Sequence, residues 1–216
     1  MKARKSIITR NTKETQISLE LNLDGTGEYS IKTPIGFLNH MLELFAKHGM
    51  FDLKINATGD TNFDDHHTIE DLGIVLGQAI KQTVAEKRGI KRYGSQILPM
   101  DEVLCVCAVD LAGRFSFETN YEPVREKVND FSTEMMRDFF KSVALNAEMN
   151  LHIQFLNPGQ NEHHRLEASF KAFARALRQA CELDPRGANN LPSTKGILGL
   201  QLSIMALATY KVYATR

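Results

Sequence analysis

Two short stretches of the sequence repeat one set of chemical groups. His66-His67-Thr68-Ile69-Glu70 and His163-His164-Arg165-Leu166-Glu167 each carry two adjacent imidazoles followed by a carboxylate. On a helix, which turns about 100° per residue, the two histidines diverge and the glutamate falls between their directions. Each motif therefore suits a pair of metal sites, with one imidazole for each site and the glutamate at one of them. Mixed nitrogen and oxygen donors without thiolates suit Mn²⁺, Fe²⁺, Co²⁺ or Zn²⁺.

A single His-His pair at the start of a helix is more often a solvated surface pair than a metal site. The repetition of the motif at matched places favours metal binding. His40, off the apolar face of a predicted helix, and His152, in the strand before the second motif, are candidate extra ligands. His40 alone could equally be a hydrogen-bonded helix histidine, and we interpret His48 as structural.

A second group of residues suits an anion. The loop Leu191–Gly196 offers the hydroxyls of Ser193 and Thr194, free backbone N–H groups and the ammonium of Lys195, all of which bind phosphate well. Taken alone, the same loop could be an ordinary surface turn. Four further charged residues could be plain surface charges or site residues: Arg92 and Arg114 at predicted strand starts, Lys171 on the face of Glu167, and Glu14 before a strand.

The helices and strands that must position these groups follow the same predicted order in both halves of the chain. Each half reads strand, strand, helix, strand, helix, from alternating or helical apolar spacing. The first half has strands at 16–24, 28–33 and 51–57, a helix from after Pro34 to Gly49, and a helix that Asp64 or Asp65 can cap. The second half has strands at 103–111, 114–121 and 151–156, a helix after Ser132, and a final helix reaching Cys181. Both histidine motifs open the last helix of their half, and we expect the halves to share one core.

Composition narrows the class of protein. The chain has 216 residues, with 26 Lys and Arg against 26 Asp and Glu, so no charge excess favours nucleic acid or membranes as partners. The N-terminus lacks the apolar region of a signal peptide, and residues 196–210 are too short and polar to span a bilayer. Three unpatterned cysteines, Cys105, Cys107 and Cys181, fit buried thiols in a reducing compartment. We expect a cytoplasmic globular protein.

Taken together, these residues resemble the imidazoleglycerol-phosphate dehydratase family of histidine biosynthesis, over residues 9–196 of the chain. The resemblance rests on the two motifs and on a set of shorter stretches: Thr12–Thr15, Phe37–Leu42, Pro99–Glu102, Asp110–Arg114, Leu151–Ile153, Phe170–Ala172 and Pro192–Gly196. It implies an α/β fold, a two-layer sandwich of sheet and helices that arose from a duplicated half-domain. We assign residues 1–98 to the first half, 99–196 to the second, and 197–216 to a tail of unknown role.

The resemblance also implies a site. It implies two Mn²⁺ ions per active site, at subunit interfaces of a 24-subunit shell. Their expected ligands are His40, His66, His67, Glu70, His152, His163, His164 and Glu167. The expected substrate contacts are Arg92, Arg114, Lys171, Ser193, Thr194 and Lys195, and Glu14 is the expected acid/base residue, with His40 and Lys171 also at the catalytic centre. Asn39 and Ala112 depart from the family pattern, and Asn39 is expected to weaken support for His40.

The implied reaction explains the need for metal. Dehydration of imidazoleglycerol phosphate removes an unactivated proton, for which a carboxylate alone is too weak a base. Metals on both ring nitrogens would make the ring imidazolate-like, so that its electrons help to expel hydroxide. Two rival classes remain open from the residues: another dinuclear metalloenzyme, such as a phosphate-ester hydrolase, and a non-catalytic metal-binding or storage shell. The storage shell gives no role to Glu14, Arg92, Arg114 or the Ser193–Lys195 loop.

Overall fold

A computed structural model describes residues 4–187 and 190–199 of the chain. The first half contains β1 (Lys5–Asn11), β2 (Thr15–Asn22), β3 (Tyr29–Lys32), α1 (Gly36–Gly49), β4 (Asp52–Gly59) and α2 (His66–Val84). The second contains β5 (Tyr93–Met100), β6 (Val103–Asp110), β7 (Ser116–Thr119), the small strands β8 (Lys127–Val128) and β9 (Phe131–Ser132), α3 (Met135–Ala147), β10 (Asn150–Asn157) and α4 (Glu162–Cys181), followed by the 3₁₀ turn Pro185–Gly187.

The two halves build matching sheets. The strand orders are β1-β2-β4-β3 and β5-β6-β10-β7, and in each sheet only the last pair is parallel. Side chains alternate along the strands, as in β2, where Ile17, Leu19 and Leu21 are buried while their neighbours are exposed or half-buried. One face of each sheet therefore packs against helices, and the other carries polar side chains together with a few exposed apolar ones.

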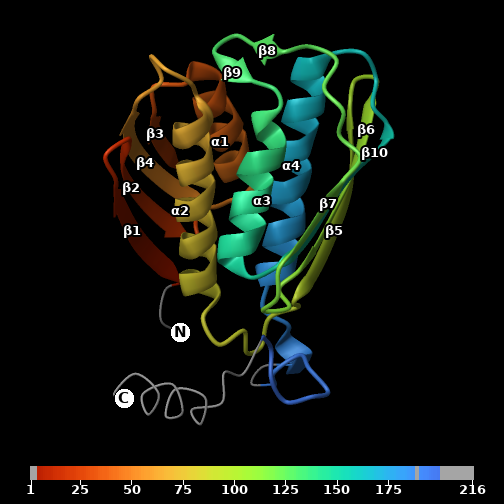
Figure 1. The fold of residues 1–216 in the computed structure, drawn as a ribbon. Helices are drawn as coiled ribbons and strands as arrows, with labels where there is room; N and C mark the ends of the chain where they lie inside the picture. The colour runs from red at the N-terminus through yellow and green to blue at the C-terminus, as the bar shows by residue number, and fades with distance from the viewer. Residues whose placement is uncertain (1–3, 188–189, 200–216) are drawn as a thin grey trace, which may run out of the picture.

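The helices lie between the two sheets (Figure 1). Helix α2 packs on α3 and α1 packs on α4, so each half is a sheet-and-helix unit joined to the other through its helices. The close packing of α2 against α3 explains why α2 has glycine at two positions. A Cβ on Gly73 would lie 2.7 Å from the Phe139 carbonyl oxygen, and one on Gly77 would lie 2.6 Å from that of Val143. A single cluster of buried apolar side chains runs through both halves, which confirms the predicted shared core.

The structure corrects the sequence prediction at the sheet edges. Apolar periodicity indicates neither β1 nor β5, the strands that begin the two halves, although the strand start predicted at Arg92 fits β5. The β8–β9 hairpin was also not expected. Both missed strands are edge strands with polar or partly exposed side chains, so their apolar alternation is weak. The predicted division after residue 98 falls inside β5, which pairs with β6 along its length, so the sheets divide between α2 and β5. The predicted tail, 197–216, lies outside the described residues beyond Gly199.

Side-chain caps fix the helix ends that carry the histidines. Asp130 of the β8–β9 hairpin accepts the backbone N–H groups of Gly36 and Phe37 at 2.6 and 2.9 Å, at the start of α1. Before α2, Asp64 accepts the His66 N–H, while Asp65 instead accepts the N–H of Ser132 at 2.6 Å. These contacts tie the second half to the first. No helix in the described ranges is long and apolar enough to cross a membrane.

Candidate active site

The clearest donor cluster joins α1 to α4. His40 Nε2 lies 3.8 Å from Glu167 Oε2, and His163 Nε2 lies 3.1 Å from the same oxygen. The other oxygen of Glu167 accepts a hydrogen bond from the Lys171 ammonium, one helical turn further on. Burial is the largest single effect and opposes ionisation of Glu167, but the hydrogen bonds and positive charges of Lys171 and His163 together outweigh it and lower the pKa of the carboxyl. Two imidazole nitrogens and a carboxylate oxygen within 4.8 Å of one another are a donor set that suits a divalent metal ion.

The second histidine of this motif turns to other partners. His164 Nδ1 lies 2.9 Å from Glu102 Oε2, and His164 Nε2 lies 3.6 Å from Asp101 Oδ2. Glu102 also accepts the backbone N–H groups of Gln160 and Asn161. The hydrogen bond from His164, followed by that from Asn161, lowers the pKa of Glu102 to about 2. The histidines of one motif thus point to separate places, as the helical geometry predicts.

The first motif has the same division. His66 Nε2 is 4.0 Å from Glu70 Oε2, whereas His67 Nδ1 is 3.0 Å from Asp60 Oδ2. The hydrogen bond to Asp60 raises the pKa of His67. The carboxylate of Glu14 lies 3.9 Å from the same ring, so the predicted acid/base residue sits beside the first motif. In each motif the glutamate therefore approaches the first histidine and another carboxylate holds the second.

Some predicted ligands do not meet within one chain. His152 occupies an exposed position of β10, on the face of the second sheet opposite the helices. In the described part of the chain, the groups of donors close enough to share an ion are His40–His163–Glu167 and Asp101–Glu102–His164. His66, His67, Glu70 and His152 belong to neither group.

The predicted anion-binding residues gather at the other end of α4. The Arg92 backbone N–H donates to the carbonyl of Ala180, near the end of that helix. The Arg92 guanidinium pairs with Asp110 at 2.7 and 3.0 Å and donates to the Pro192 carbonyl at 2.8 Å. Arg92 therefore holds the start of the predicted phosphate loop.

The loop itself is closed by its own serine. Ser193 Oγ donates to the Ile197 carbonyl at 2.8 Å and accepts the Lys195 N–H, while the Thr194 and Lys195 side chains are exposed. Gly113, next to exposed Arg114, lies against Gly199: a Cβ at Gly113 would be 2.5 Å from Gly199 Cα. Arg92, Arg114 and the loop thus share one end of the molecule.

Three residues, Asn39, Asp60 and Glu102, have contacts that the sequence-based interpretation does not include. Asn39 accepts the Thr33 N–H at 3.0 Å and donates to the Thr33 carbonyl at 3.2 Å, so its amide holds the turn before α1. An aspartate could not make the second bond, which explains why an amide suits this position. Asp60 and Glu102 were given no role from the sequence. Glu102 lies within the Pro99–Glu102 stretch that resembles the family, and this resemblance is the sequence feature that could have indicated a role for it.

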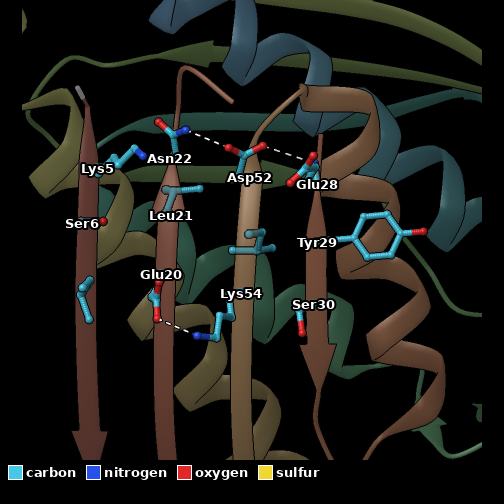
Figure 2. Close-up of a pocket in the computed structure, with 12 residues that line it drawn as sticks. Lys5, Ser6, Glu20, Leu21, Asn22, Glu28, Tyr29, Ser30, Asp52 and Lys54 are labelled. Carbon is cyan, nitrogen blue, oxygen red and sulfur yellow. Dashed lines mark hydrogen bonds and ion pairs between the residues drawn. The ribbon is translucent and has the colours of Figure 1, made fainter. Parts of the chain in front are cut away.

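An open hollow of about 360 Å³ lies elsewhere, on the outer face of the first sheet (Figure 2). Its polar contacts are structural: Asn22 donates to Asp52, and Lys54 pairs with Glu20. None of the predicted site residues lines it, so it is not the candidate active site.

Fold and site together define an α/β protein of two similar halves, with imidazoles and carboxylates at one end and the loop of Ser193, Thr194 and Lys195 at the other. A model of the imidazoleglycerol-phosphate dehydratase family matches residues 33–177. The enzyme of that name from Lachnoclostridium phytofermentans is 55% identical over 88% of this chain and 95% of its own length. The one from Geobacillus kaustophilus is 51% identical over 91% of this chain and 100% of its own length.

Solved structures of the same family are similar to this fold. The crystal structure of imidazoleglycerol-phosphate dehydratase from Staphylococcus aureus has a TM-score of 0.76 and 39% identity, and the match covers 83% of this chain and 99% of that one. The Pyrococcus furiosus structure has a TM-score of 0.76 and 34% identity, covering 88% and 100%. The chain belongs to the imidazoleglycerol-phosphate dehydratase family, which makes it a hydro-lyase.

Proposed function

We propose that this chain converts imidazoleglycerol phosphate to imidazoleacetol phosphate in histidine biosynthesis. The carbon attached to the ring loses hydroxide, the neighbouring carbon loses a proton, and the resulting enol becomes the ketone. Family membership supports this reaction. The single structural observation that carries it is the cluster of His40, His163 and Glu167, a donor set near the starts of α1 and α4.

The residues fit divalent metal ions, and we take these to be two Mn²⁺ per active site. His40, His163 and Glu167 would hold one ion, because their donor atoms already lie close together. His66, His67, Glu70, His152 and His164 would supply the remaining ligands. When bound, such ions would act as Lewis acids on the imidazole ring of the substrate.

The complete site requires more than one copy of the chain. The histidine cluster lies at the start of α4, and Arg92 and its loop lie at the end. At about 1.5 Å per residue, α4 separates His163 from Ala180 by roughly 25 Å. Only three carbons join the ring to the phosphate in the substrate, so one molecule cannot reach both ends of the same chain.

A homo-oligomer resolves this separation, and we propose the 24-subunit shell that the family resemblance implies. The outer faces of the sheets support burial in an assembly. They expose Ile7 and Tyr29 on the first sheet, and Tyr93 and Ile97 on the second, with Ile7 67% and Ile97 61% exposed. His152 faces the same side of the second sheet, where a neighbouring chain could complete its coordination.

The remaining residues take roles from their placement. Arg114, Ser193, Thr194 and Lys195 would bind the phosphate, and Arg92 would hold their loop in addition to any substrate contact. Glu14 would move the proton, because its carboxylate stands beside the first motif. Lys171 would act through its ion pair with Glu167. We place the enzyme in the cytoplasm, which suits three buried, unpaired cysteines.

The test is turnover of imidazoleglycerol phosphate by protein that has been stripped with a chelator and then reloaded with Mn²⁺. The proposal expects imidazoleacetol phosphate to form only after reloading. Release of inorganic phosphate instead would identify a hydrolase, and metal uptake without any turnover would favour a storage role.

A further inference from the structure

The two histidines of each motif are held through different ring atoms. The first histidines, His66 and His163, face the glutamate of their own motif through Nε2. The second histidines, His67 and His164, instead face an outside carboxylate through Nδ1, at 3.0 Å for Asp60 and 2.9 Å for Glu102. The same arrangement occurs in both halves, although Asp60 follows β4 whereas Glu102 comes from the turn between β5 and β6.

A chain of hydrogen bonds fixes the tautomer of His164. The Asn161 side-chain oxygen accepts the His163 backbone N–H at 3.0 Å, which caps α4. The amide nitrogen of Asn161 therefore faces His164 Nε2, at 3.3 Å. An amide nitrogen only donates, so Nε2 must accept and the ring proton must lie on Nδ1. The Nδ1–H group then donates to Glu102.

Glu102 is itself held in place. One oxygen accepts the backbone N–H groups of Gln160 and Asn161 at 3.2 and 3.0 Å, which leaves the other for His164. Gly159, at a φ of +59°, lets the loop close around this carboxylate, because a Cβ there would lie 2.5 Å from Glu102 Cγ. The carboxylate is thus fixed by the same loop that starts α4.

Asp60 is arranged in a comparable way around His67. Its backbone carbonyl accepts the Phe63 N–H at 2.8 Å, which closes the turn before α2. One carboxylate oxygen faces His67 Nδ1, and the other is buried without a hydrogen-bond partner in the structure.

We infer that Asp60 and Glu102 are positioning residues, one in each half, which hold His67 and His164 as Nδ1–H tautomers, so that each Nε2 carries the lone pair that a divalent cation would take. A carboxylate on the far nitrogen orients a ligating imidazole and raises its basicity, and losing such a partner typically weakens metal binding about 10- to 100-fold. This inference rests on the proposed role of these histidines as metal ligands.

The substitution Glu102→Gln gives a sharp test, because the new amide has one acceptor and one donor. Its oxygen is expected to stay on the Gln160 and Asn161 N–H groups, which preserves the loop. Its NH₂ group then faces His164 Nδ1, so that nitrogen must accept and the proton must move to Nε2. In Asp60→Asn no second hydrogen bond decides whether the amide oxygen or the NH₂ group faces His67 Nδ1. This substitution should therefore weaken the preference of His67 for the Nδ1–H tautomer without reversing it.

The tautomers are read by solid-state ¹⁵N NMR of metal-free, histidine-labelled protein, with His67→Asn and His164→Asn variants to assign the signals. Wild type should show both rings as Nδ1–H, and Glu102→Gln should convert His164 to Nε2–H. Wild-type rings protonated on Nε2, or a His164 signal that Glu102→Gln leaves unchanged, would overturn the inference.

Mn²⁺ affinity, measured by calorimetric titration, gives the second readout. Glu102→Gln should weaken binding about 10- to 100-fold. Glu126→Gln is the control, since it removes an equal charge from an exposed side chain that contacts neither ring nitrogen of His164, and it should change affinity much less. Equal losses in the two variants would mean that charge, not orientation, matters, and would refute positioning. If wild type binds no Mn²⁺, the proposed metal function fails, while the NMR result still decides the tautomer.

Discussion

Glu14 shows how a single side chain can be tested apart from the metal ligands. Its carboxylate is about half exposed and approaches His67 only to 3.9 Å, in contrast to Glu167, which is buried between two imidazoles. Glu14→Gln keeps the shape and removes the basicity, so kcat should fall about 10²- to 10⁴-fold, the usual value of general acid–base catalysis. Steady-state kinetics and elemental analysis of bound Mn²⁺ check this together.

The comparison variant is Glu167→Gln, which should lose Mn²⁺ as well as rate. If Glu14→Gln keeps more than about a tenth of wild-type kcat, Glu14 does not carry the proton. Lys171 would then be the better candidate, because its ammonium already lies against Glu167.

Lys195 tests the anion end of the molecule. Lys195→Ala removes an exposed cation from the loop and no metal donor, so KM for imidazoleglycerol phosphate should rise while Mn²⁺ content stays constant. A charged contact is worth roughly 1.5–3 kcal/mol, which corresponds to a loss of about ten- to a hundredfold in kcat/KM. Lys141→Ala, an exposed lysine of α3, serves as the control. Equal kcat/KM for the two variants would exclude Lys195 from the phosphate site.

Among the elements, the β8–β9 hairpin has a specific task. Asp130 caps α1, whose first turns carry His40, so Asp130→Ala should destabilise the protein by about 1 kcal/mol, as loss of an N-cap does. It should also weaken Mn²⁺ binding, because the His40 ring loses its fixed approach to Glu167. Thermal unfolding and Mn²⁺ titration measure the two effects. Lys127→Ala in the same hairpin should change neither the stability nor the Mn²⁺ affinity. If Asp130→Ala binds Mn²⁺ as tightly as wild type, the hairpin does not position His40.

The elements also show what sequence periodicity can predict. Helices α1, α2, α3 and α4 were predicted because their buried faces repeat with helical spacing, and the two histidine motifs lie at the starts of α2 and α4, as predicted. Strands β1 and β5 were not predicted from apolar periodicity, because an edge strand needs only a weak apolar alternation. The match of Glu102 to His164 depends on a turn and a helix that are far apart in sequence, which local spacing does not encode.

At the scale of the whole molecule, the ligand set of one chain is incomplete. His152 and the first motif have no shared donor group within the described residues, so bound metal should link neighbouring chains. Chelation should therefore shift the protein towards smaller species, and Mn²⁺ should restore the large assembly, because binding to the assembled state favours it. Light scattering during a cycle of chelation and reloading follows this change. A fully active monomer would rule out interface sites.

The separation of the two ends of α4 allows a direct test of how the catalytic site is built. One variant, His163→Ala, has a damaged histidine end, and a second, Arg114→Ala with Lys195→Ala, has a damaged anion end. Each alone should be nearly inactive on imidazoleglycerol phosphate. The two are mixed as metal-free chains and then assembled with Mn²⁺, so that intact ends from different chains can meet.

The decisive measurement is the dehydration rate of this mixture. If each site combines the histidine end of one chain with the anion end of another, up to about a quarter of the sites become intact, and activity should rise far above that of either variant alone. A mixture no more active than the sum of its two components would contradict a dehydratase site shared between chains.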